Sequence, residues 1–319
     1  MARVRTRPAP RQAIPRTIQS YHEAAQQLAD FVADQWCGKS CEHEAHDGAS
    51  FEEMTKAHVT DYLIEYMERQ STPAAGVRFR SLRRFFNWMV EEEILDESPM
   101  RRMREPVPDE EPVEVPPLDH VRKLLETCEG RKATDPRRKF NDLRDAAIIR
   151  LFCEPGAPRV AEMAGIEVAR VDMVTDVVAV LGKGRKWRSV PFSAKTGKAL
   201  SKYLRARPKH PLVVAAKAKD HDSDGPARLW MGWRGKPLDS SGIYQMIERR
   251  CEEAGIPRIH PHQLRHFAVD AWYEDGGSVQ DAMTLFGWSS PAMAHHYAKA
   301  TAGKRVINAA RRASIGDQL

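Results

Sequence analysis

A proline-rich, acidic segment divides the chain of 319 residues into two parts. Residues 106–117 read PVPDEEPVEVPP and contain five prolines and four acidic residues. Because proline lacks a backbone N–H and restricts the residue before it, this segment can form neither a helix nor a central strand. It is expected to be extended, and at about 3.1 Å per residue its length is roughly 37 Å. We therefore predict two domains, residues 17–105 and residues 118–319, joined by this linker.

The charge of the chain favours a polyanionic partner. The net charge is +6 and the isoelectric point is about 9.1, which fits a nucleic-acid-binding protein. Residues 1–16 contain five arginines, three prolines and no acidic residue. We predict a disordered basic arm, which either contacts DNA phosphates and the minor groove or only keeps the chain in solution. No apolar run is long enough to span a bilayer and the N-terminus is unlike a signal peptide, so a cytoplasmic location is expected.

The cysteines do not suggest a metal centre. There are five, an odd and scattered set, and free thiols are expected. One cluster contains four residue types that bind zinc, namely Cys37, Cys41, His43 and His46. Its spacing is too compact for an ordinary zinc finger, so a polar loop between helices is favoured. No metal or other cofactor is predicted.

The first domain is predicted to be helical throughout. Apolar residues recur at helical spacing along it, and Ser50 with Glu53 matches a capping box at the start of one helix. A further helix is expected from Thr72, and a short one over residues 94–103. The helix from Thr72 carries basic residues between its apolar positions, which suits a helix lying along a DNA groove. These candidate DNA-binding residues are Arg78, Arg80, Arg83 and Arg84.

The second domain is predicted to be mainly α with a small antiparallel β-sheet. Residues 177–181 and 187–192 are rich in β-branched and aromatic residues, and GKGRK between them is a glycine-containing turn. Lys186 and Arg188, in and after this turn, are candidate phosphate contacts. Residues 207–228 are expected to form a polar loop.

Residues 260–300 carry the densest set of chemically active side chains. Helices are expected from His262 to the glycine pair at 276–277, from Ser278, and from Ser290–Pro291. Arg265 is a permanent cation suited to phosphate, histidines such as His262 transfer protons near neutral pH, and Tyr297 is an oxygen nucleophile. Together they suggest phosphoryl transfer through a covalent tyrosyl phosphate. Taken singly, each could be only a solvated helix face or a packing residue.

The order and spacing of these residues resemble a known family. HQLRH is followed by GWSS and then by Tyr297, with intervals of 3 (265 − 262), 23 (288 − 265) and 9 (297 − 288) residues. This is similar to the C-terminal signature of the tyrosine recombinases, or phage integrase family. The segment FFNWMVEEEILDESPM, near the end of the first domain, resembles the end of that family's core-binding domain. The resemblance implies a two-domain fold, with a helical core-binding domain and an α+β catalytic domain that ends in a helix near residues 305–314.

The resemblance also implies roles for individual residues. Arg159 takes the place of the first catalytic arginine, although Ala157–Pro158 replaces the usual Gly-Leu before it. Lys183, 24 residues later (183 − 159), takes the place of the lysine that protonates the leaving group. The implied catalytic set is completed by His262, Arg265, Trp288 in place of the commoner histidine, and the nucleophile Tyr297. Supporting roles are implied for Glu162 and His266.

The implied function is site-specific DNA recombination. Strands would be cleaved and rejoined through a 3′-phosphotyrosyl intermediate and a Holliday junction by four protomers on double-stranded DNA. Accessory DNA-bending proteins, and a bacterial, phage or mobile-element setting, are further expectations. Two alternatives stay open: a type IB topoisomerase, which relaxes DNA by the same chemistry, and a DNA-binding module without catalysis.

Overall fold

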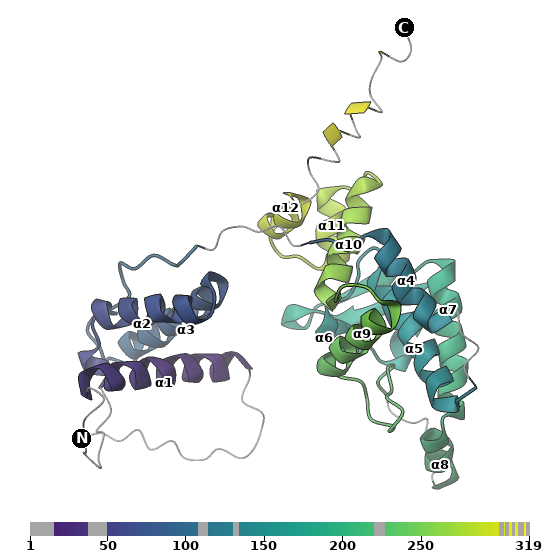
Figure 1. The fold of residues 1–319 in the computed structure, drawn as a ribbon, viewed down its shortest axis with the longest axis horizontal. Coiled ribbons are helices and arrows are strands. Elements are labelled where there is room, and N and C mark those ends of the chain that lie inside the picture. Colours follow the sequence, from purple (N-terminus) through teal and green to yellow (C-terminus); the bar gives the residue numbers. More distant parts are fainter. Residues whose placement is uncertain are drawn as a thin grey trace. The chain divides into compact units, whose positions relative to one another are not determined.

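The computed structural model divides the chain into two compact units, Met1–Glu111 and Pro112–Leu319 (Figure 1). It describes residues 16–37, 50–107, 114–129, 134–219 and 227–299, and isolated residues at 303, 306, 307, 310, 311 and 316. Four expectations fall largely or partly outside these residues: the basic arm apart from Arg16, the cysteine–histidine cluster apart from Cys37, residues 108–113 of the linker, and most of the last helix at 305–314.

The first unit is a small helical bundle. Its helices are α1 (Arg16–Cys37), α2 (Lys56–Arg69) and α3 (Thr72–Glu91), with a short 3₁₀ turn at Phe51–Glu53. One face of each helix is apolar and packs into a common core that includes Leu28, Val59, Phe79, Leu82 and Phe86. Ser71 caps α3 and Pro73 lies in its first turn, which explains why the helix begins there.

Two local predictions in this unit are wrong. Ser50 caps only the 3₁₀ turn, and α2 begins later, where Thr55 and His58 form the capping box. Residues 94–103 form turns instead of a helix. The chain enters them through Glu93, which has a positive φ of 57°, and Pro99 interrupts them, so a continuous helix cannot form.

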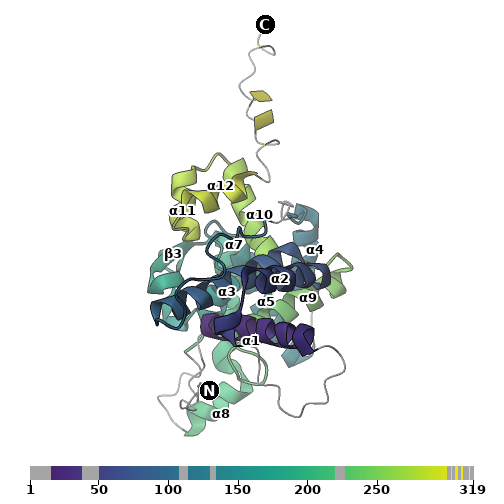
Figure 2. The same cartoon turned by 90° about the vertical axis from the view of Figure 1, so that its left-hand side faces the viewer.

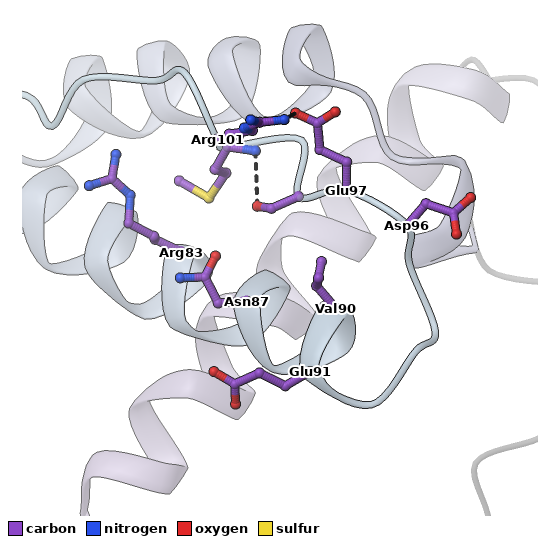
Figure 3. Close-up of a pocket in the computed structure, with 9 residues that line it drawn as sticks. Arg83, Asn87, Val90, Glu91, Asp96, Glu97 and Arg101 are labelled. Carbon is purple, nitrogen blue, oxygen red and sulfur yellow. Dashed lines mark hydrogen bonds and ion pairs between the residues drawn. The ribbon is translucent and has the colours of Figure 1, made fainter.

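These turns fold back over the end of α3. Met100 is buried in the core, and Arg83 of α3 donates to the carbonyl of Met103. Between α3 and the turns lies a shallow pocket of 610 Å³ (Figure 3). Its charged lining residues are of both signs, namely Arg83, Arg101, Glu91, Asp96 and Glu97, so it has no strong preference for an anion.

The second unit is mainly α with a three-stranded antiparallel sheet, which confirms the predicted fold class. The strands are β1 (Val171–Asp172), β2 (Val177–Leu181) and β3 (Trp187–Pro191), in the order β1-β2-β3. The helices are α4 (Leu118–Glu129), α5 (Pro136–Phe152), α6 (Val160–Gly165), α7 (Ala194–Ala206), α8 (Pro211–Lys219), α9 (Ser240–Ala254), α10 (Pro261–Glu274), α11 (Val279–Phe286) and α12 (Pro291–Lys299).

Helix α5 forms the centre of this unit. Its residues Ala147 to Ile149 are fully buried, and it packs against α4, α7, α9 and α10. A buried ion network ties α5 to α9, because Arg250 donates to both Asp142 and Asp145, and Asp145 also accepts from Arg144. Helices α10, α11 and α12 gather at one end of the unit, with β3 beside α11 (Figure 2).

The cysteines whose side chains are described are free thiols. Burial raises the pKa of Cys128 and Cys153 to about 12 and also raises that of Cys251. These thiols therefore stay protonated and unreactive.

A buried histidine predicts that stability falls in mild acid. His210 is 2% exposed, its ring lies 4.8 Å from those of Phe140 and Trp233, and its Nδ1 accepts from the backbone N–H of Leu212 at 3.3 Å. Burial lowers its pKa, so the unfolded chain binds the proton more readily. The contribution of neutral His210 to the free energy of unfolding is therefore fully present above about pH 6.5, the ordinary pKa of histidine. This contribution is lost as the pH falls from there through the lower pKa of the folded state.

Urea unfolding at pH 7.5 and pH 5.5 checks this expectation. The free energy of unfolding should drop more between the two pH values in the wild type than in His210→Gln, which cannot titrate. Equal drops in both proteins would show that His210 does not titrate on unfolding.

Candidate active site

Four segments of the second unit bring the sequence-identified residues together. Helix α10 carries His262, Arg265 and His266 on its first turns, which begin at Pro261. Arg159 directly precedes α6, Trp288 follows α11, and Tyr297 lies on α12. Spacings of three and four residues put the α10 side chains on neighbouring faces. Helix α12 packs on both α10 and α11, which places Tyr297 beside the histidines.

Tyr297 is held between two rings. The ring of His266 stacks on it at 4.2 Å with an interplanar angle of 25°, and the ring of Trp288 stacks at 4.8 Å and 29°. The side chain is 6% exposed. Its hydroxyl oxygen lies 3.5 Å from His262 Nε2, which in turn lies 3.0 Å from His266 Nε2. The hydroxyl therefore has a ring nitrogen within reach that can accept its proton when His262 Nε2 carries no hydrogen, and the packing fixes the direction of the hydroxyl.

Arg265 is a buried cation without a carboxylate partner in the described parts of the chain. It is 1% exposed and donates only to the backbone carbonyls of Ala157 and Phe286. Burial, with the nearby charges of Arg159 and Arg188, lowers its pKa to about 10, so it is still protonated at neutral pH. An uncompensated buried charge is costly, and the site would therefore gain from binding an anion.

Arg159 provides a second cation at the same place. Its Nη1 lies 2.8 Å from Glu162 Oε1, and its Nη2 donates to the carbonyl of Gly287 at 3.2 Å. Glu162 also accepts from the Arg159 backbone N–H at 2.9 Å. The side chain of Arg159 is 38% exposed, so part of its guanidinium group faces solvent.

Glu162 supports the arginines as a carboxylate. Burial alone would raise its pKa, but the charge of Arg188 and the hydrogen bonds from Arg159 and Arg188 outweigh burial and lower the pKa. The group is therefore ionised. One carboxylate serves two guanidinium groups here, which leaves the site with excess positive charge.

Trp288 brings an unused donor to the site. Its indole ring is buried against Phe286, at 5.2 Å and 17°, and against Tyr297. Its Nε1 has no hydrogen-bond partner among the described residues. A buried N–H without an acceptor costs free energy, so this group too would gain from an oxygen ligand.

The hairpin of β2 and β3 borders the site where its turn begins, at Gly182. Residues pair from Val177 with Pro191 to Leu181 with Trp187. A Cβ atom placed on Gly182 would lie 3.4 Å from Glu162 Oε1, so the start of the turn lies against the Arg159–Glu162 pair. The turn that follows contains Lys183, whose side chain lies outside the described residues, and Lys186, which is exposed.

Arg188 differs from the sequence-based expectation. We expected it to contact phosphate, whereas its side chain is 10% exposed and is bonded to Glu162 and to backbone carbonyls inside the unit. It lies opposite Val180, on the inward face of the hairpin. The period of the strand carried this signal, since Arg188 has the same parity as the buried Val190.

The four arginines of α3, in the first unit, fall into two pairs. Arg78 donates to the Tyr66 hydroxyl and Arg83 to the Met103 carbonyl, so both are partly buried. Arg80 and Arg84 have side chains that are 59% and 57% exposed and form ion pairs with Glu105 and Glu91. Of the four, Arg80 and Arg84 are therefore the accessible cations.

No group of His, Cys, Asp or Glu side chains that could hold a metal ion occurs in the described parts of the chain. Within the same parts, no helix is long and apolar enough to cross a membrane.

Comparison with known proteins identifies the family. The model of the phage integrase family matches residues 117–304, more than half of the chain. Tyrosine recombinase XerC of Bacillus pumilus is 28% identical over 276 residues, which cover 86% of this chain and 82% of the relative. Tyrosine recombinase XerC of Corynebacterium glutamicum is 32% identical over 171 residues. This match covers 54% of this chain and only about half, 51%, of the relative.

Solved structures with the same fold include two DNA complexes. One is the XerH site-specific recombinase bound to palindromic difH substrate, with a TM-score of 0.67 and 16% identity over 94% of this chain and 80% of that one. Another is a lambda integrase(75–356) dimer bound to a COC′ core site, with a TM-score of 0.62 and 16% identity over 90% of this chain and 89% of that one. The predicted family is thus confirmed: the chain belongs to the phage integrase family, and the two XerC relatives above are tyrosine recombinases.

Proposed function

We propose that this chain is a site-specific DNA recombinase that cleaves and rejoins strands through a covalent bond between Tyr297 and a DNA phosphate. The observation that carries the proposal is the buried, uncompensated charge of Arg265 next to a tyrosine hydroxyl that lies 3.5 Å from a histidine. A phosphate diester would supply both the missing anion and the electrophile.

The first step is attack on phosphorus by the Tyr297 oxygen. A tyrosine hydroxyl has an ordinary pKa near 10, so it needs a base, and His262 accepts its proton while His266 positions the His262 ring. Negative charge builds on the two non-bridging oxygens. Arg159 and Arg265 stabilise this charge, with the indole N–H of Trp288 as a further donor.

The same step breaks the bond to the 5′ oxygen. Lys183 protonates this oxygen as it leaves, and the products are a 3′-phosphotyrosine and a free 5′ hydroxyl. In the reverse direction a 5′ hydroxyl attacks the phosphotyrosine. Because the energy of the phosphodiester bond is kept in the intermediate, strand exchange needs no nucleotide cofactor.

The two units have separate roles in this proposal. The helical unit, residues 17–105, binds the recombination core site, and the linker at 106–117 carries the chain past the duplex to the catalytic domain. Four protomers on two DNA sites exchange strands through a Holliday junction. The DNA-bound structures of the relatives described above support DNA as the partner.

A paired-site plasmid assay tests the proposal. Binding sites selected from a random DNA pool would be cloned as direct repeats on a supercoiled plasmid. We expect excision of the intervening circle by the wild-type protein. Relaxed plasmid without strand exchange would identify a topoisomerase. Binding to the sites without relaxation of the plasmid and without recombination would identify a binding module.

DNA affinity should depend on salt through the exposed arginines of α3. Each phosphate contact contributes a slope of about −0.9 to the plot of log affinity against log salt. Replacing Arg80 and Arg84 with alanine should therefore flatten the slope by roughly 1.8. Arg69→Ala is the matched control, since this arginine of α2 is 74% exposed and paired with Glu65. Equal slopes in the wild type and the double variant would show that Arg80 and Arg84 do not face DNA.

A further inference from the structure

Arg188 is an arginine on the buried face of a strand. In the β2–β3 register it lies opposite Val180, which is buried, and Val190 on the same face is also buried. Arginine is rarely buried unless its donors are satisfied. The Nε of Arg188 has no hydrogen-bond partner among the described residues, but its Nη1 and Nη2 atoms have a specific set of acceptors.

Those acceptors come from three places in the chain. Nη1 donates to the carbonyls of Gly156 and Leu285, each at 2.6 Å. Nη2 donates to Glu162 Oε2 at 2.7 Å and lies 3.5 Å from the carbonyl of Ala157. A planar fork with fixed donor directions can join these groups at once, which a lysine cannot do.

The joined segments are the ones that carry Arg159 and Trp288. Gly156 and Ala157 lead directly into Arg159, and Glu162 holds the Arg159 guanidinium group. Leu285 lies three residues before Trp288, and the carbonyl of Gly287 between them accepts from Arg159. Arg188 thus holds together the two segments that carry Arg159 and Trp288, the groups that would surround the phosphate.

Tight packing around Arg188 leaves these segments little freedom. Gly287 has a φ of 64°, and a Cβ atom there would lie 2.9 Å from Arg188 Cδ. Gly156 has a φ of 83°, and a Cβ atom there would lie 2.9 Å from the carbonyl oxygen of Leu285. Both glycines are needed for the positive φ and for this close approach.

We propose that Arg188 is a positioning residue that sets Arg159 and Trp288 around the scissile phosphate without touching DNA. The inference rests on the proposed strand-cleavage function. The hairpin itself is held by its own strand pairing, so loss of Arg188 should displace Arg159 and Trp288 while leaving the turn with Lys183 in place.

Three DNA substrates separate these effects in single-turnover cleavage by the full chain. The first has an ordinary scissile phosphate. The second has a methylphosphonate there, which replaces one non-bridging oxygen by methyl and removes the charge that Arg159 stabilises. The third has sulfur at the bridging 5′ position, which makes the leaving group independent of a proton donor.

We expect Arg188→Met to cleave ordinary DNA slower by roughly 10²-fold, the usual effect of displacing a catalytic group by about 1 Å. The defect should shrink to a few-fold on the methylphosphonate and stay unchanged with bridging sulfur. Arg159→Ala should give the same pattern and Lys183→Ala the opposite one. Arg188→Lys keeps a charge beside Glu162 but loses the fork, and should show the same pattern with a smaller defect; it decides the question if Arg188→Met does not fold.

Arg144→Met is the matched control for stability. The side chain of Arg144 is 3% exposed and that of Arg188 is 10% exposed, so Arg144 is the more buried of the two. Arg144 bonds to Asp145 and to the Met231 carbonyl, away from the candidate site. It should lower the melting temperature but leave the cleavage rate of folded protein unchanged.

Three results would overturn the inference while the proposed function stands: wild-type rates in the Arg188 variants, rescue by bridging sulfur instead of methylphosphonate, or an equal defect on all three substrates. Absence of any adduct with the wild-type protein would overturn the proposed function, and the inference with it.

Discussion

Tyr297→Phe is expected to bind DNA as tightly as the wild-type protein and to form no covalent adduct. The change removes one oxygen and keeps the ring, so the stacking on His266 and Trp288 is preserved. Without the oxygen there is no nucleophile, and cleavage should fall below detection. A nicked suicide substrate, from which the cleaved end is lost, traps the adduct for a denaturing gel.

Tyr273→Phe is the matched control for this prediction. Tyr273 lies on the same helix as His262 and is buried. The Tyr273→Phe variant should cleave DNA at the wild-type rate. Residual adduct in Tyr297→Phe that disappears in the double variant would assign the nucleophile to Tyr273 and contradict the account.

Lys183→Ala should cleave ordinary DNA slower by roughly 10²-fold or more, the usual effect of a lost general acid. A 5′ alkoxide is a poor leaving group, with a conjugate acid roughly comparable to water at about 15.7. A thiolate leaves without help, because thiol pKa values lie near 8.5. Bridging sulfur should therefore restore most of the rate to Lys183→Ala, measured as adduct formed per unit time.

Lys186→Ala, three residues along the same turn, is the control for charge. The Lys186→Ala change should weaken DNA binding more than it slows cleavage. The ratio of its cleavage rate to that of the wild type should be the same on ordinary DNA and on DNA with bridging sulfur. Rescue of Lys186→Ala alone would mean that Lys186 is the proton donor. Rescue of neither variant would move this role to another group, with His262 the next candidate.

Local signals made the helices of the candidate site predictable. The glycine pair at 276–277 follows the end of α10, Ser278 caps α11, and Ser290–Pro291 begins α12. Each of these features acts through the backbone of its own neighbours, so the sequence alone is sufficient. The spacing of HQLRH, GWSS and Tyr297 added the family, and the match over residues 117–304 confirms it.

Features that depend on distant partners were not predictable in the same way. Arg188 looked like a surface cation because its acceptors, Gly156, Glu162 and Leu285, are remote in sequence. The helix α8 was missed within a segment expected to be a polar loop. The pairing of Arg83 with Met103, across the turns that replace the expected helix at 94–103, likewise depends on the fold.

Identification of the DNA-linked peptide tests the central claim most directly. The wild-type adduct would be trapped, trimmed with nuclease, and digested with a protease that cleaves after glutamate. Cleavage after Glu253 and Glu274 places Tyr273 and Tyr297 in different peptides, residues 254–274 and 275–319. We predict that mass spectrometry finds the nucleotide phosphate on residues 275–319, at Tyr297, with a free 5′ hydroxyl on the released strand. A nucleotide on residues 254–274, or on any residue other than Tyr297, would contradict the account.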